Sequence, residues 1–263
     1  IENYNIDDGR MEPLALAVLA GLTPPQHKVR LLDDRMEDIS GEETADLVAI
    51  TVDTFTARRS YQIAAMFQAR GVPVCLGGVH VSLLPDEAQT HADALLIGDA
   101  EPVWETLLED LAKGDLQPRY QGEFTTPQRG TFPVRSLFAN RGYLPISLIQ
   151  FSRGCPFNCA HCSVSRVFGH AHNFRPVEEV VAEIKRFNLK FVLFVDDNIT
   201  ANADRAKELF RALIPLKISW CSQASIDMIE DSELMDLMRR SGCIGQLIGF
   251  ESMDEESLRW MNK

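Results

Sequence analysis

Apolar runs of strand length alternate with helix-length segments along the first half of the chain. Strands are expected at 28–32, 47–51, 72–76 and 94–97, and helices at 13–22, 58–70 and 101–113. Apolar strands separated by helices predict a parallel sheet that is covered on both faces. We therefore predict an α/β fold in which residues 1–116 form a doubly wound, Rossmann-like domain. Because the sequence begins at Ile1, we expect it to be a piece of a longer chain that lacks the first strand of this domain.

The second half of the chain repeats one strand–helix unit. Strands are expected at 146–151, 191–195, 218–223 and 246–250, and helices at 176–187, 204–213, 232–240 and from 255 onward. Successive units of this kind with short connections are typical of a (β/α) barrel. Residues 146–263 are therefore predicted to form the first half of such a barrel.

Between the two halves, residues 117–145 have no regular hydrophobic period and are rich in Pro, Gly, Thr and Arg. This composition is typical of a solvated connector, and we predict a linker here. Contact of its arginines with a phosphate group is the alternative. The arginines are Arg119, Arg129, Arg135 and Arg141, and Glu123 is the single acidic residue among them.

Composition narrows the class of protein. The 263 residues carry a formal net charge of −12, which disfavours nucleic acid as a bulk partner. Apolar runs all fall short of the roughly 18 residues that a membrane-spanning helix needs, and no secretory signal is visible. Three of the six cysteines are clustered, which favours a reducing compartment and metal ligation over disulfides. We expect a cytoplasmic protein without a transmembrane segment.

The clustered cysteines form the sharpest motif in the sequence. Cys155, Cys159 and Cys162 lie in the segment RGCPFNCAHC, at C-x3-C-x2-C spacing, directly after the first strand of the second half. Three thiolates on a four-iron cube leave one iron open to a small molecule. Zinc is the competing metal, because a histidine could complete a four-ligand site. The candidate histidines are His161, His170 and His172.

This loop and the strands after it resemble the radical S-adenosylmethionine (SAM) superfamily. The resemblance implies that the three cysteines hold a 4Fe–4S cluster whose open iron binds SAM, and that SAM is cleaved to a radical that abstracts hydrogen from an unactivated carbon. It places SAM contacts at the carboxyl ends of the barrel strands, where such barrels build their sites. These contacts would come from His161, Asp196, Asp197, Gln223, Ser225 and Glu251. The stretch Asp196-Asp197-Asn198 departs from the Gly-Gly-Glu-like family pattern, and a helix cap or turn is its alternative role.

The first half resembles the cobalamin-binding domain that precedes a class of radical SAM enzymes. The segments that carry the resemblance are Gly77-Gly78-Val79-His80 after the third expected strand and IGDAE at 97–101 after the fourth. It implies cobalamin contacts from Met11, Thr51, Thr54, Phe55, Gly77, Gly78, Val79, His80, Gly98 and Glu101. Residues 7–13 (DDGRMEP) contain no histidine, so we expect cobalt without an imidazole ligand from the protein.

The two resemblances together predict a cobalamin-dependent radical SAM enzyme, with transfer of a methyl group to an unactivated carbon as the favoured reaction. Ring formation or oxidation with the same cofactors is one alternative, and a non-enzymatic cobalamin sensor is another. Methylthiotransferases carry three cysteines in their first domain, whereas this chain has only Cys75 there, which disfavours that class. The expected partners are a small-molecule, lipid or peptide substrate and a one-electron donor such as flavodoxin or ferredoxin.

Overall fold

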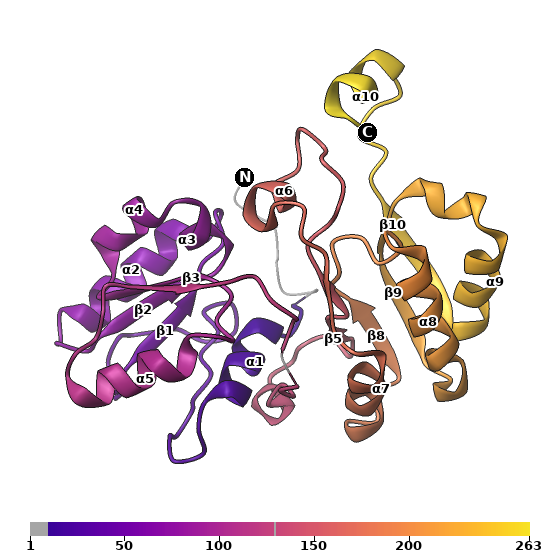
Figure 1. Ribbon diagram of the computed structural model, residues 1–263. Coiled ribbons are helices and arrows are strands. Elements are labelled where there is room, and N and C mark those ends of the chain that lie inside the picture. The colour runs from indigo at the N-terminus through magenta and orange to yellow at the C-terminus, as the bar shows by residue number, and fades with distance from the viewer. Residues whose placement is uncertain (1–9, 129) are drawn as a thin grey trace. The chain divides into compact units, whose positions relative to one another are not determined.

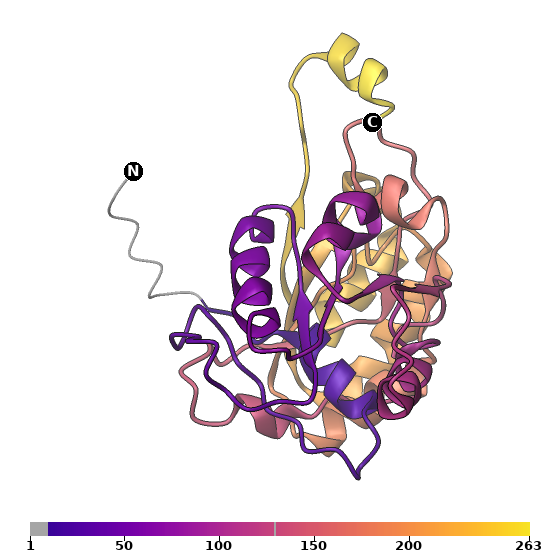
Figure 2. The same ribbon diagram turned by 90° about the vertical axis from the view of Figure 1, so that its left-hand side faces the viewer.

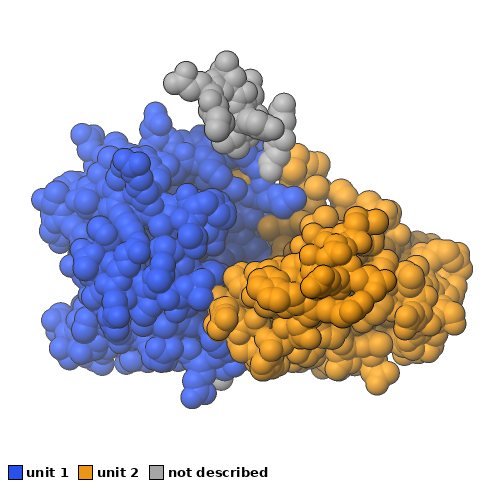
Figure 3. All heavy atoms as spheres, turned by 90° about the horizontal axis from the view of Figure 1, so that it is seen from above, with its two compact units in different colours: residues 1–125, 131–142 blue, residues 126–130, 143–263 orange. Residues whose placement is uncertain are grey.

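The computed structural model describes residues 10–128 and 130–263, which form two compact units (Figures 1 and 3). The first unit contains residues up to 125 together with 131–142, and the second contains 126–130 and 143–263. Each unit is built on one parallel four-stranded sheet with its own hydrophobic core. The expected α/β class with parallel sheets is thereby confirmed.

The sheet of the first unit has the strand order β1-β2-β3-β4. Its strands are β1 (Val48–Thr51), β2 (Val74–Gly77), β3 (Ala94–Gly98) and β4 (Arg119–Gly122). Side chains alternate between the two faces, because successive residues of a strand point to opposite sides. Leu76 packs into the cluster that contains α2 (Ala57–Gln68), whereas Cys75 packs into the cluster that contains α5 (Trp104–Lys113).

Helices therefore cover both faces of this sheet (Figure 1). On the face of α2 lie α3 (Val79–Leu83) and α4 (Pro85–Ala88), followed by the short helix η1 (Gln89–His91). On the face of α5 lies α1 (Leu14–Leu22), where Trp104 donates a hydrogen bond from Nε1 to Thr23 Oγ1 at 2.9 Å. The short helix η2 (Arg135–Phe138) also belongs to this unit.

Two expectations for the first unit are corrected by the structure. Residues 28–32 form no strand, because the Leu31 carbonyl accepts a hydrogen bond from the Arg141 side chain instead of from a neighbouring strand. The segment 117–145, expected as a connector, contains β4. Its alternating exposure buries Tyr120 beside α5, where the hydroxyl donates to Asp110. A strand with one apolar residue escapes a search for apolar runs.

The sheet of the second unit has the order β10-β9-β8-β5, with all neighbours parallel. Its strands are β5 (Ser147–Ile149), β8 (Phe191–Phe194), β9 (Ser219–Ala224) and β10 (Cys243–Ile248). A small antiparallel pair, β6 (Ser152–Arg153) with β7 (Asn173–Phe174), follows β5. The helices are α6 (Val164–Phe168), α7 (Val177–Arg186), α8 (Ala203–Leu213), η3 (Ile214–Leu216), η4 (Ile226–Glu230), α9 (Ser232–Ser241) and α10 (Glu255–Met261).

The core of this unit lies between the sheet and α7, α8 and α9 (Figure 1). In α7, Val177, Val180 and Ile184 recur at helical spacing and are buried, which sets the face that packs on the sheet. At the centre, Trp220 stacks on Phe210 with ring centroids 4.8 Å apart. Beyond β10 an extended segment leads to α10, which has no buried residue (Figure 2). No helix within 10–128 and 130–263 is long and apolar enough to cross a bilayer.

Candidate functional site

The three clustered cysteines lie in one loop between β6 and α6 of the second unit. All three thiols are free and half-buried. Burial raises the pKa of the Cys155 thiol, and the nearby Asp197, Cys162 and Cys159 raise it further. Among the described residues, no group of three or more His, Cys, Asp or Glu side chains is gathered around a single metal-ion position.

Gly154 sets the direction in which the loop leaves β6. Its φ is +86°, and a Cβ at this position would lie 2.2 Å from the Ala171 carbonyl oxygen. Only glycine combines this backbone conformation with so close an approach. The cysteine loop therefore emerges against the segment that returns to β7.

Asp196 anchors the residues that precede the loop. Its side chain is fully buried and accepts hydrogen bonds from Phe151 N at 3.0 Å, Ser152 N at 2.5 Å and Ser152 Oγ at 2.6 Å. Burial raises the pKa of Asp196 to about 7, although the three donors oppose that shift. Both carboxylate oxygens are engaged within the protein, so this carboxylate acts as an anchor for β6.

Asp197 faces the loop itself. Its Oδ2 accepts a hydrogen bond from Gly154 N at 2.9 Å, and its side chain is only partly buried. Burial raises the pKa of Asp197, whereas the Gly154 amide and the Arg153 guanidinium lower it. Of the two adjacent carboxylates, Asp197 is the one beside the cysteines.

Three other residues that were expected to bind SAM lie at the carboxyl ends of β9 and β10. Ser225 Oγ accepts a hydrogen bond from Asn198 Nδ2 at 2.7 Å, and the Gln223 side chain is exposed. Glu251, which has a φ of +61°, lies 3.6 Å from His161 Nε2 through Oε1. The structure thus brings His161 and Glu251 together, and Asn198 joins the strand ends of β8 and β9.

Two further groups lie near the cysteine loop: His172, which was expected only as an alternative zinc ligand, and a buried ion pair that was not predicted. His172 Nε2 lies 3.2 Å from Ser152 Oγ, and burial lowers the pKa of His172 to about 4. Arg175 and Glu183 form a fully buried ion pair of 2.9 Å, and Arg175 also donates to the Gln150 carbonyl at 3.0 Å. Sequence offered one signal for the pair, the acidic Glu183 on the otherwise apolar face of the helix.

In the first unit, the residues expected to bind cobalamin lie mainly at the carboxyl ends of β1, β2 and β3. Thr51, Thr54 and Phe55 follow or end β1 and are exposed, with Phe55 87% accessible. Gly77 ends β2, and Gly78, Val79 and His80 begin the helical turn after it. Gly98 ends β3, and Glu101 lies in the turn that follows.

Two of the glycines at these strand ends, Gly78 and Gly98, serve close backbone contacts. A Cβ on Gly98 would lie 2.1 Å from the Gly122 carbonyl oxygen, so the residue allows β3 and β4 to approach. Met11 precedes α1, and its carbonyl accepts a hydrogen bond from Arg35 at 3.0 Å. Of the segment 7–13, where no histidine was found for cobalt, residues 7–9 fall outside the described residues.

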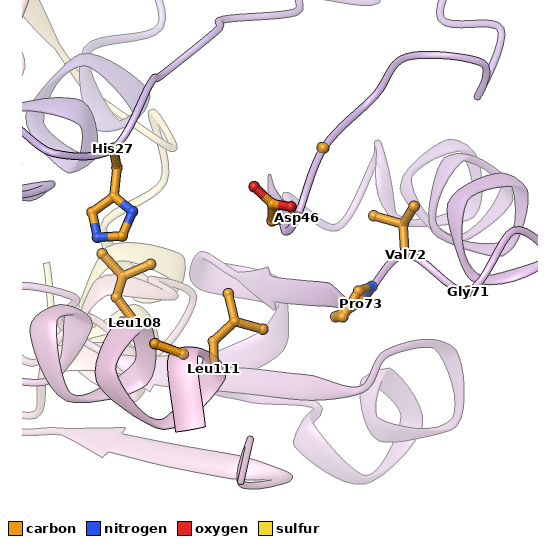
Figure 4. Close-up of a pocket in the computed structure, with 9 residues that line it drawn as sticks. His27, Asp46, Gly71, Val72, Pro73, Leu108 and Leu111 are labelled. Carbon is orange, nitrogen blue, oxygen red and sulfur yellow. The ribbon is translucent and has the colours of Figure 1, made fainter. Parts of the chain in front are cut away.

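A depression of about 480 Å³ lies at the other end of this sheet (Figure 4). Asp46 and Pro73, which precede β1 and β2, line it together with His27 and Leu108. It is therefore at the amino ends of the strands and is separate from the residues expected to bind cobalamin.

Comparison with known proteins first concerns the second unit. Residues 149–263 match the family model described as the radical SAM superfamily. Members of the superfamily use a 4Fe–4S cluster and SAM, which the cysteine loop was expected to hold.

Relatives extend the similarity over nearly the whole chain. Bacteriochlorophyllide d C-8(2)-methyltransferase of Chlorobaculum tepidum is 32% identical over 98% of this chain and 62% of its own length. Hopanoid C-2 methylase of Rhodopseudomonas palustris is 26% identical over 96% of this chain and 51% of its own length. The chain thus spans about 50–60% of the length of these relatives.

A solved structure supports the same fold. The radical SAM methyltransferase TsrM of Kitasatospora setae, solved with cobalamin and a 4Fe–4S cluster, superposes with a TM-score of 0.74 and 19% identity. The superposition covers 94% of this chain and 59% of TsrM. At this level of identity the likeness shows that the two share a fold.

Proposed function

We propose that this chain is part of a cobalamin-dependent radical SAM methyltransferase that acts on an unactivated carbon. The observation that carries the proposal is the cysteine loop, with three free thiols held at the carboxyl end of β5 by Asp196 and Asp197. Methyltransferase names among relatives that match nearly the whole chain support the reaction type. When bound, the cluster would supply the electron that cleaves SAM, and cobalamin would supply the methyl group.

The donor set fits a cluster held by three thiolates. Cys155, Cys159 and Cys162 are free, lie in one loop, and are partly accessible rather than sealed in a core. Asp197 and Glu251 would bind polar groups of SAM, because carboxylates pair well with ammonium and hydroxyl donors. His161, Gln223 and Ser225 would complete the SAM site. Asp196 would position the loop without touching SAM, since its oxygens already accept three hydrogen bonds.

The first unit would bind cobalamin at the carboxyl ends of its strands, where open parallel sheets bind ligands. Exposed apolar side chains there, Phe55 at 87% and Val79 at 40%, fit a large planar ligand. Thr51, Thr54, Gly77, Gly78, Gly98, Glu101 and Met11 would line the same site, with His80 behind it. We further propose a cytoplasmic setting, a one-electron protein donor, and a small-molecule, lipid or peptide substrate.

Metal analysis of the anaerobically purified chain, with cobalamin supplied, tests the proposal. We expect about four irons and one cobalt per chain. Cys159→Ala should lose the iron and SAM cleavage but keep the cobalt, while Cys221→Ala, outside the loop, should keep both metals. Iron without cobalt would contradict methyl transfer from cobalamin. Zinc in place of iron would contradict the proposed 4Fe–4S cluster.

The products of SAM separate the favoured reaction from its alternatives. Methyl transfer with radical cleavage should yield both S-adenosylhomocysteine and 5′-deoxyadenosine. Ring formation or oxidation would yield 5′-deoxyadenosine alone. Cobalt binding with neither product would favour a sensor.

A further inference from the structure

A buried histidine lies directly behind an exposed threonine at the carboxyl end of the first unit's sheet. His80 is 3% accessible, whereas Thr54, in the turn after β1, is exposed. Gly78 brings the two together, because its φ is +104° and a Cβ there would lie 2.8 Å from the Val52 carbonyl oxygen. That oxygen instead accepts a hydrogen bond from His80 N at 3.1 Å.

Both ring nitrogens of His80 are engaged. Nδ1 lies 3.2 Å from Thr54 Oγ1, and Nε2 lies 3.0 Å from the Tyr61 hydroxyl oxygen. The Tyr61 hydroxyl donates to Glu87 Oε1 at 3.2 Å, and His80 Nε2 is 3.4 Å from that same oxygen. Four side chains from the β1–α2 turn, α2, α3 and α4 thus form one chain of hydrogen bonds, referred to below as the His80 relay.

The carboxylate at the end of the His80 relay sets the direction of every bond in it. An ionised Glu87 only accepts, so the Tyr61 hydroxyl must donate to it. Burial, and then the hydrogen bond to Glu87, raise the pKa of Tyr61 to about 12, so the phenol keeps its proton. An unprotonated Nε2 would point its lone pair at the carboxylate, so Nε2 carries the hydrogen. In a neutral imidazole Nδ1 then accepts, and it accepts from Thr54.

Because the Thr54 hydroxyl donates its hydrogen to His80 Nδ1, its oxygen presents only lone pairs to solvent. An exposed threonine hydroxyl can bond to water in any orientation, so its orientation by the buried His80 has no evident structural need. We propose that Thr54 accepts a hydrogen bond from an amide N–H of the bound corrinoid, and that His80 is the positioning residue that orients it. This inference rests on the proposed function, because cobalamin, which carries several primary amides, is the ligand.

Two histidine variants distinguish positioning from simple support of the fold. The asparagine of His80→Asn places its side-chain oxygen near the position of Nδ1 and can still accept from Thr54. The glutamine of His80→Gln reaches the position of Nε2 and leaves Thr54 without a partner. Titration of the full chain with hydroxocobalamin should give about three- to tenfold weaker binding for Thr54→Val and His80→Gln, the loss of roughly one hydrogen bond. His80→Asn and Thr54→Ser should stay within about twofold of wild type.

The controls make each outcome decisive. Thr44→Val removes another exposed threonine hydroxyl of the same unit and should bind as wild type does. Equal affinities for His80→Asn and His80→Gln, or an unchanged Thr54→Val, would overturn the positioning role even if both histidine variants melt at lower temperature. A folded wild-type chain that binds no cobalamin would instead contradict the proposed function.

The direction of the His80 relay can also be measured without any ligand. The ¹⁵N chemical shifts of the His80 ring, assigned with the two variants, should show a protonated Nε2 and an unprotonated Nδ1. The opposite tautomer would overturn the lone-pair assignment for Thr54, whatever the outcome of the cobalamin titration.

Discussion

Asp196 and Ser152 are joined by two hydrogen bonds, from the Ser152 amide at 2.5 Å and from its hydroxyl at 2.6 Å, both to Oδ1 of the carboxylate. The other oxygen accepts from Phe151 N at 3.0 Å. Asp196 follows β8, and Ser152 begins β6, from which the cysteine loop leaves. One buried carboxylate therefore ties two neighbouring strand ends together at the root of the cysteine loop.

Replacing this carboxylate should loosen the loop. In Asp196→Asn the amide would point two hydrogens at backbone or hydroxyl donors, leaving at least one buried donor without an acceptor. We expect a loss of about 1–3 kcal/mol in unfolding free energy, and faster removal of iron by a chelator at temperatures where the chain stays folded. Asp227→Asn, on an exposed aspartate of the same unit, is the matched control. Equal rates of iron loss in the two variants would show that Asp196 does not position the loop.

The raised pKa of Asp196 also predicts how stability depends on pH. Its pKa is about 7 in the folded chain against 3.8 for an ordinary aspartate. The folded state therefore holds this proton more tightly, so its contribution to stability is complete below about pH 4 and is lost as the pH rises to about 7.

Asp196→Asn cannot titrate, so it isolates this contribution. The difference in melting temperature, wild type minus Asp196→Asn, should shrink between about pH 4 and 7 and level off above. Thermal melts of both proteins across this range provide the measurement. A difference that grows with pH would mean that the three donors keep Asp196 ionised throughout.

Gly154→Ala should disturb the cysteine loop more than an ordinary glycine substitution does. The new methyl group would meet the Ala171 carbonyl oxygen at 2.2 Å, in addition to the strain of φ +86°. Gly169, with φ +61° and nothing within 4 Å, carries the backbone strain alone. We expect Gly154→Ala to lose most of its iron on reconstitution and Gly169→Ala to retain it. A similar loss of iron in both variants would attribute that loss to backbone strain, and full iron content in both would show that the contact with Ala171 does not matter.

The sequence predicted the elements with strong apolar periodicity well. Helix 204–213 was expected where the structure has Ala203–Leu213, because an apolar face repeats there and Asn202 caps the start by accepting from Arg205 N. Strand β4 was missed, because Tyr120 is its only large apolar residue. Residues 28–32 were wrongly expected as a strand, since Leu31 is buried and Leu32 packs against the core without pairing to a neighbouring strand, while Val29 is exposed.

For the candidate site, sequence indicated which strand ends carry polar residues but not how they bond. The pair Asp196-Asp197 was singled out as one feature, yet the structure separates the two by burial and by partner. His80 was expected at the ligand, and it lies buried behind Thr54. Such distinctions depend on contacts between residues about 26 to 45 positions apart, which spacing along the chain does not encode.

The buried pair Arg175 and Glu183 should be among the most sensitive polar contacts of the second unit. Both side chains are fully buried at an N–O distance of 2.9 Å, and Arg175 also holds the Gln150 carbonyl next to the cysteine loop. Arg175→Met would remove the Arg175 guanidinium from beside the buried Glu183 carboxylate, at a cost of about 3–5 kcal/mol. The exposed pair Arg239 and Asp236, at 2.8 Å, should lose less than about 1 kcal/mol in Arg239→Met. Chemical denaturation measures both losses. A double variant Arg175→Met with Glu183→Leu should recover part of the loss, because it removes the buried carboxylate together with the guanidinium. A double variant no more stable than Arg175→Met alone would show that the contact to Gln150, rather than the ion pair, carries the stability.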